Sequence, residues 1–143
     1  MQYSHDSVLN SIYRNAETGQ QAIFDLIPKV DDGGFLKDIK TQQAEYAEIA
    51  QEAVAQLSDM GVKPDPVSGV KKMGMKMGVT MNTMLENDVS HLAQLMIKGS
   101  NMGIVNMTNV LNNYPNPKPE IKSLATKLIN IEHQNLERLK TYL

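Results

Sequence analysis

Two pairs of polar side chains have a spacing that could bring them together for chemistry inside a helical protein. Gln43 and Tyr46 are three residues apart, and Glu132 and Asn135 repeat that spacing near the end of the chain. Residues three or four apart lie on the same face of a helix, so each pair would present its polar groups side by side. A buried amide, hydroxyl or carboxyl needs a hydrogen-bond partner. We therefore expect the two pairs to meet in a polar layer of the protein interior.

The first pair belongs to the clearest apolar repeat of the sequence. Steps of three and four residues alternate along it, which is the pattern of a helix packed against other helices. The repeat consists of Leu36, Ile39, Gln43, Tyr46, Ala50, Ala53, Leu57 and Met60. Because Gln43 and Tyr46 lie at the middle of this repeat, a helical bundle would bury both of them.

Three further stretches carry apolar residues at helical spacing. They cover about residues 4–27, 81–111 and 119–143. Gly33 and Gly34 predict a tight turn before the second helix, Gly61 its end, and Pro119 the first position of the last helix. Residues 62–70 hold two prolines and are long enough to cross the bundle. These features predict an all-α fold, an antiparallel four-helix bundle with a long crossover between its second and third helices.

Composition limits the function classes. The chain has 143 residues, 41% of them hydrophobic, which predicts a single domain over residues 1–143. The net charge is −2, Trp is absent and aromatic residues make up 5%, so we expect no nucleic-acid partner. No apolar run approaches the roughly 20 residues that span a membrane, and no signal peptide is evident. The absence of cysteine excludes disulfides and thiolate sites and agrees with a cytoplasmic location.

The first and third helices repeat a local pattern. Glu17 precedes Gly19 at the middle of the first helix, and Ser100 precedes Gly103 in the third. In the ferritin-like, rubrerythrin-like superfamily, the first and third helices carry a mid-helix glutamate, and the second and fourth carry Glu-x-x-His. The polar positions of this chain resemble that arrangement. The closing sequence EHQNLERLKTYL resembles bacterial members of that superfamily, and the likeness covers about residues 9–143. Its catalytic members hold a di-iron centre built from four glutamates and two histidines.

The resemblance implies where the ligands of such a centre would lie. The six positions fall, in chain order, on Glu17, Gln43, Tyr46, Ser100, Glu132 and Asn135. Only Glu17 and Glu132 keep a ligand-type side chain, and two carboxylates cannot saturate a pair of hard cations. We therefore expect a hydrogen-bond network among these residues, with no metal cofactor, in place of a di-iron centre.

Two other features could bind metal. Asp88 and His91 have a spacing that suits two zinc ligands on a helix, although an isolated ion pair or an oligomer contact is the favoured interpretation. Eight of the ten methionines gather in the third helix and the residues before it: Met73, Met75, Met77, Met81, Met84, Met96, Met102 and Met107. Thioethers bind Cu(I), but flexible methionines also fill core gaps or form adaptable interfaces, which is the favoured interpretation here. Residues 70–80 are expected to form a separate turn or a kinked lead-in to the helix.

Two functional hypotheses follow. The first is a non-catalytic, cytoplasmic, ferritin-like bundle that is structural, interacts with other proteins or binds a small ligand. It would form a homodimer or bind a protein partner through the Met- and Gly-rich third helix. The second is an iron- or copper-binding protein or oxidoreductase with a variant site around Glu17 and Glu132. No phosphate-binding loop and no nucleophile with a positioned base accompany either hypothesis.

Overall fold

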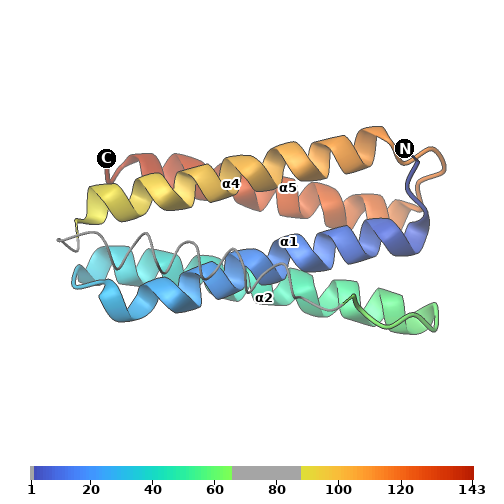
Figure 1. The fold of residues 1–143 in the computed structure, drawn as a ribbon, viewed down its shortest axis with the longest axis horizontal. Coiled ribbons are helices and arrows are strands. Elements are labelled where there is room, and N and C mark those ends of the chain that lie inside the picture. The colour runs from blue at the N-terminus through green and yellow to red at the C-terminus, as the bar shows by residue number, and fades with distance from the viewer. Residues whose placement is uncertain (1, 66–87) are drawn as a thin grey trace.

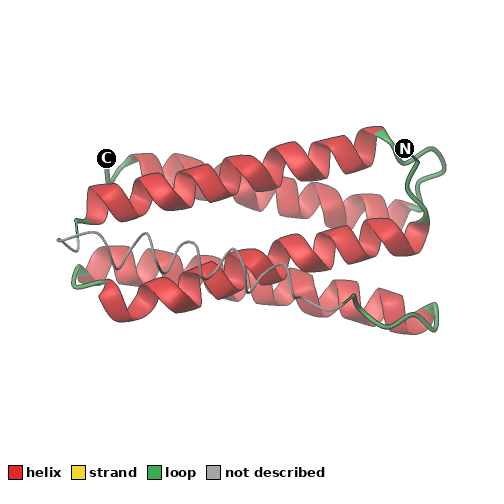
Figure 2. Cartoon of the chain, in the orientation of Figure 1, coloured by secondary structure: helices red, strands yellow, loops and turns green. Residues whose placement is uncertain are grey.

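The computed structural model describes residues 2–65 and 88–143, and this part of the chain is nearly all helical (Figure 2). Its helices are α1 (His5–Leu26), α2 (Gly33–Asp59), α4 (Val89–Asn112) and α5 (Pro119–Lys140), with a 3-10 turn at Ile27–Lys29. These described residues contain no strand, and the all-α prediction is confirmed. The predicted start of the third helix, its lead-in at 70–80 and the methionines from Met73 to Met84 lie outside the described residues.

Local sequence explains where the helices begin and end. Ser4 and Ser7 form a capping box at the start of α1. The Asp32 side chain accepts a hydrogen bond from Phe35 N at 2.8 Å and caps α2, so Gly33 lies in the first helical turn. The tight turn predicted at Gly33 and Gly34 is therefore wrong.

The end of α2 agrees with the prediction. Gly61 has a φ of +71°, which glycine adopts without strain. Gly61 N donates to Ser58 O and Val62 N donates to Leu57 O, both at 2.9 Å, as in a Schellman cap. Pro119 occupies the first turn of α5 as predicted.

The four helices form two closely packed pairs. α1 packs most extensively on α2 and α4 on α5, while contacts between the two pairs are fewer (Figure 1). Asn10 Oδ1 accepts from Asp65 N at 2.8 Å, which places the start of α1 beside the chain that leaves α2. α1 and α2 therefore run in opposite directions.

The ends of the two pairs are also tied together. Tyr3 N donates to Asn113 O at 2.8 Å, joining the start of α1 to the end of α4. The rings of Phe35 and Tyr142 meet edge to face with centroids 4.9 Å apart, joining the start of α2 to the end of α5. Aliphatic side chains and Phe35 fill the core between them; the largest fully buried ones include Leu9, Ile12, Ile39, Ile49, Leu57, Met107, Ile121 and Leu128.

The buried face of α2 differs from the predicted repeat. Gln42 is completely buried, whereas Gln43 is only half-buried, Leu36 is half-buried and Met60 is exposed. Because α2 packs on both α1 and α5, its buried face is wider than a single 3-4 repeat and includes residues on one flank of it. The placement of Gln43 in the core is therefore wrong, and Gln42 is the buried amide.

Candidate functional site

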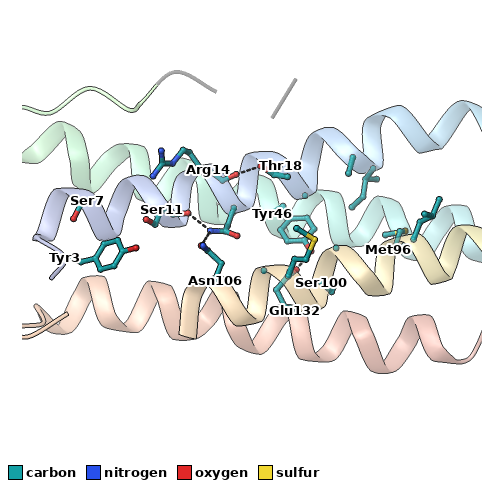
Figure 3. Close-up of a pocket in the computed structure, with 18 of the residues that line it drawn as sticks. Tyr3, Ser7, Ser11, Arg14, Thr18, Tyr46, Met96, Ser100, Asn106 and Glu132 are labelled. Carbon is teal, nitrogen blue, oxygen red and sulfur yellow. Dashed lines mark hydrogen bonds between the residues drawn. The ribbon is translucent and has the colours of Figure 1, made fainter. Parts of the chain in front are cut away.

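A cleft of about 720 Å³ lies between α1 and α4, where the two helix pairs face one another (Figure 3). Its walls come mainly from these two helices. Tyr46 from α2 and Glu132 from α5 reach the cleft from the opposite side and form its floor. Both floor residues are only 5% exposed, so the cleft connects the surface with the buried polar layer of the protein.

The two ends of the cleft have different chemistry. The end near the start of α1 is lined by hydroxyl, amide and guanidinium groups from Ser7, Ser11, Arg14, Asn15 and Asn106. The other end is lined by the apolar side chains of Ala22, Ile23, Leu95 and Met96. Figure 3 shows this order, with Ser7 at one end, Tyr46 and Glu132 in the middle and Met96 at the other end.

Few side chains cross the cleft. Asn15 Nδ2 donates to Asn106 Oδ1 at 2.8 Å and links α1 to α4 at the polar end. Gly99 and Gly103 add no side chain to the α4 wall, and a Cβ added to Gly99 would meet no atom within 4 Å. The cleft is thus open at Gly99, where a larger residue would extend into it.

Two glycines also make room for the pair on the floor. A Cβ at Gly19 would lie 2.7 Å from Cε2 of Tyr46, and one at Gly103 would lie closer still to Oε2 of Glu132. Real Cβ atoms do not approach other atoms so closely, so an alanine at either position would force the facing side chain to shift. Gly19 belongs to α1 and Gly103 to α4, so both walls of the cleft fit around the pair.

The floor residues are hydrogen-bonded to each other. The Tyr46 hydroxyl donates to Oε1 of Glu132, so this part of the predicted polar network is present. Burial raises the pKa of Glu132 to about 8, because water no longer stabilises the charged carboxylate. No positively charged group among residues 2–65 and 88–143 forms an ion pair with Glu132. At neutral pH the carboxyl therefore carries a proton and can donate a hydrogen bond.

The amides next to this pair differ from the predicted network. Gln42 lies one helical turn from Tyr46, and Asn135 lies one turn from Glu132. Both are nearly fully buried. Neither polar atom of the Gln42 amide, nor Nδ2 of Asn135, has a hydrogen-bond partner among the described residues. Each such buried atom costs about 1–3 kcal/mol, which makes this layer the least satisfied part of the described core.

The other predicted site residues are dispersed. Ser100 is buried and lines the cleft, but Glu17 is only half-buried and lies outside the lining. A two-metal centre needs several carboxylates that converge, and among residues 2–65 and 88–143 Glu132 is the single carboxyl of the cleft lining. The described part of the chain contains no cluster of three or more histidine, aspartate or glutamate side chains that could hold a metal ion. The residues therefore do not fit a di-iron centre.

Asp88 and His91 lie at the start of α4, away from the cleft. Asp88 is the N-cap and accepts a hydrogen bond from Ser90 N at 3.0 Å. His91 Nδ1 is 3.5 Å from an Asp88 carboxylate oxygen, and both side chains are substantially exposed. The two side chains are therefore in contact, and the capping bond gives the aspartate a structural role; the predicted ion pair or oligomer contact stays a prediction.

Sequence reasoning missed several residues of the cleft. The one indication of the cleft in the sequence is the presence of glycines at the middle of helices. Gly19, Gly99 and Gly103 each cost helix stability relative to alanine, so a packing reason for them is expected. Small residues on a helix can admit a neighbouring helix, but Gly103 faces a single side chain, that of Glu132. Asn15 and Asn106 are ordinary polar residues on predicted helices, and no spacing rule distinguishes them from solvent-exposed ones.

No described helix has the length and apolar character needed to cross a membrane. The sequence matches no protein-family model, no curated protein and no solved structure, so the interpretation of the cleft rests on its geometry.

Proposed function

We propose that this protein is a non-catalytic small-molecule-binding bundle whose binding site is the cleft between α1 and α4. The observation that carries the proposal is the hydrogen-bonded Tyr46–Glu132 pair on the floor of an otherwise open cleft. Binding sites for small molecules are typically concave, largely apolar and equipped with a few convergent polar groups. The cleft has this composition, and its volume lies within the usual range of about 300–1,000 Å³.

The composition of the lining supports binding more than catalysis. A catalytic acid or base must lie within hydrogen-bond reach of the proton that it transfers. Among the described residues the lining contains no histidine and no second carboxyl, and the Tyr46 hydroxyl, which is within reach of Glu132, is engaged in the hydrogen bond between the two. Its hydroxyl and amide groups are suited to orient a ligand, and the buried Tyr46 ring offers an apolar contact.

A fluorescence titration tests this function. N-phenyl-1-naphthylamine, an uncharged probe that brightens in apolar surroundings, should bind the wild-type protein. Gly99→Leu should abolish the signal, because the added side chain extends into the open space of the cleft. Asn101→Leu provides the matched control, since it adds the same side chain to an exposed position of α4 outside the lining. Equal binding by the Gly99 and Asn101 variants would show that the cleft is not the site.

We also propose a ferritin-like connectivity for the bundle, a cytoplasmic location and a homodimeric state. The surface of α4 supports the proposal of a dimer, because two of its apolar residues, Met102 and Val105, are 59% and 69% exposed to solvent. Sedimentation equilibrium of the wild type and of Val105→Lys would test it. A dimer that persists unchanged in the variant would contradict a contact through this face of α4.

A further inference from the structure

We propose that the cleft selects an amphiphilic organic amine, with its ammonium group at Glu132 and its hydrocarbon part along the apolar end. The inference rests on the proposed function and adds the chemical class of the ligand. It follows from three features of the cleft: a free carboxyl oxygen on the floor, the charge balance of the lining and the apolar end.

One oxygen of the Glu132 carboxyl, Oε2, has no hydrogen-bond partner within the described part of the chain. Oε1 accepts the hydrogen bond of the Tyr46 hydroxyl. Oε2 lies against the bare backbone position of Gly103, on the α4 side of the floor. Gly99, one turn earlier on α4, borders open space. Ser100 and Met102 lie between these glycines in the sequence and also line the cleft, so an ammonium group that reaches Oε2 along this wall passes beside a hydroxyl and a thioether.

The charge of the lining favours a cation. Among the described residues, Arg14 from α1 is the single charged residue of the lining apart from Glu132. The Arg14 side chain is half-exposed, and its Nη1 already lies 3.7 Å from Oδ2 of Asp65. Tyr46 is the titratable group that α2 directs at Glu132, and α4 adds no charged residue to the lining. An ionised Glu132 would consequently have no counter-ion among the described residues, and a ligand cation would supply one.

Ionisation of Glu132 is accessible near neutral pH. Because its pKa is about 8, roughly one molecule in ten already carries the carboxylate at pH 7. A bound ammonium group stabilises the carboxylate and lowers its pKa. The site therefore changes from a neutral carboxyl to an ion pair when the amine binds.

The apolar end accounts for the rest of the ligand. Ala22, Ile23, Leu95 and Met96 line the cleft beyond the Tyr46–Glu132 pair. A methionine adapts its shape to irregular apolar groups. An alkyl chain attached to the amine would lie here and bury its surface against these side chains.

Competition between matched ligands tests the inference. Octylamine and octanol share one hydrocarbon chain, and octylamine remains cationic at about pH 9 because alkylamines resemble lysine. We expect octylamine to displace N-phenyl-1-naphthylamine from the wild type at about tenfold lower concentration than octanol at this pH. The preference should shrink at about pH 6, where Glu132 is protonated.

Two glutamine variants assign the preference to one carboxyl. Glu132→Gln keeps the shape of the protonated side chain and should bind both ligands equally. Glu17→Gln is the matched control, because Glu17 lies on α1 outside the lining, and it should retain the tenfold preference.

The outcomes separate the two proposals. If the probe binds and Gly99→Leu prevents it, the cleft is a binding site whatever the amine does. Equal displacement by octylamine and octanol would then overturn the amine inference alone, and so would a preference that survives in Glu132→Gln. If the probe fails to bind the wild type, the proposed function itself is wrong.

Discussion

The helix α1 takes part in two interfaces of opposite character. Toward α2 it packs closely, and the small, almost fully buried Ala16, Ala50 and Ala53 belong to these two helices. Toward α4 it leaves a cleft lined by glycines, hydroxyls and amides. Along the cleft, glycines make room for the Tyr46–Glu132 pair and for open space, whereas the contact of α1 with α2 is extensive.

The largest expected difference between the two regions comes from a matched pair of truncations. Leu9→Ala removes a fully buried side chain of α1 outside the cleft and should cost about 2–5 kcal/mol of unfolding free energy. Leu95→Ala removes the same side chain from the cleft wall and should cost about 1 kcal/mol, because less buried contact is lost there. Urea unfolding measures both. Equal losses would show that the cleft is as tightly packed as the core.

The next effect is a pH dependence that originates on the cleft floor. The pKa of Glu132 is raised in the folded state to about 8, so the folded protein binds a proton that the unfolded chain has lost. Stability from this group is complete below pH 4.5 and falls as the pH rises toward 8, by up to about 1.4 kcal/mol per unit. Glu132→Gln should remove this loss, so that between about pH 5 and 7 it gains roughly 2 kcal/mol relative to wild type.

Thermal or urea unfolding of both proteins across this pH range provides the measurement. Parallel curves for wild type and variant would mean that Glu132 titrates normally in the folded protein. The pair shares every other titrating group, so their difference isolates this carboxyl.

The last comparison distinguishes two glycines one turn apart on α4. Gly99→Ala should stabilise the protein by about 1 kcal/mol, because alanine favours the helix and its Cβ meets open space. Gly103→Ala should destabilise it by about 1–3 kcal/mol, because its Cβ would displace the buried Glu132 carboxyl. Opposite signs in urea unfolding would support the described geometry of the cleft. The same sign for both would contradict it.

Periodicity and capping chemistry were sufficient to predict the helices. The capping box at Ser4, the glycine cap at Gly61 and Pro119 at the start of α5 depend on neighbouring residues, and the sequence contains all of that information. The burial of Gln42 could not be predicted from neighbouring residues, because it depends on how α2 is rotated toward two other helices at once. A heptad template assumes a single partner and therefore selected Gln43.

The candidate site was predictable only in part. Tyr46 and Glu132 could be paired from their helical positions, since each lies near the middle of a predicted helix. The cleft could not be predicted, because it results from the distance between α1 and α4. That distance depends on the sizes of all the side chains along both helices. The glycines that open it are ambiguous in sequence. A small residue permits close approach of a helix as readily as it permits a cavity.

The fit of Gly103 around Glu132 has a consequence for how this sequence can change over time. Each residue restricts the other: alanine at 103 is unfavourable while a long side chain stands at 132, and a shorter residue at 132 would lift that restriction. Gly19 and Tyr46 restrict one another in the same way. Homologous chains should therefore exchange these residues as pairs, and a glycine lost at either position should be accompanied by a smaller residue at its partner.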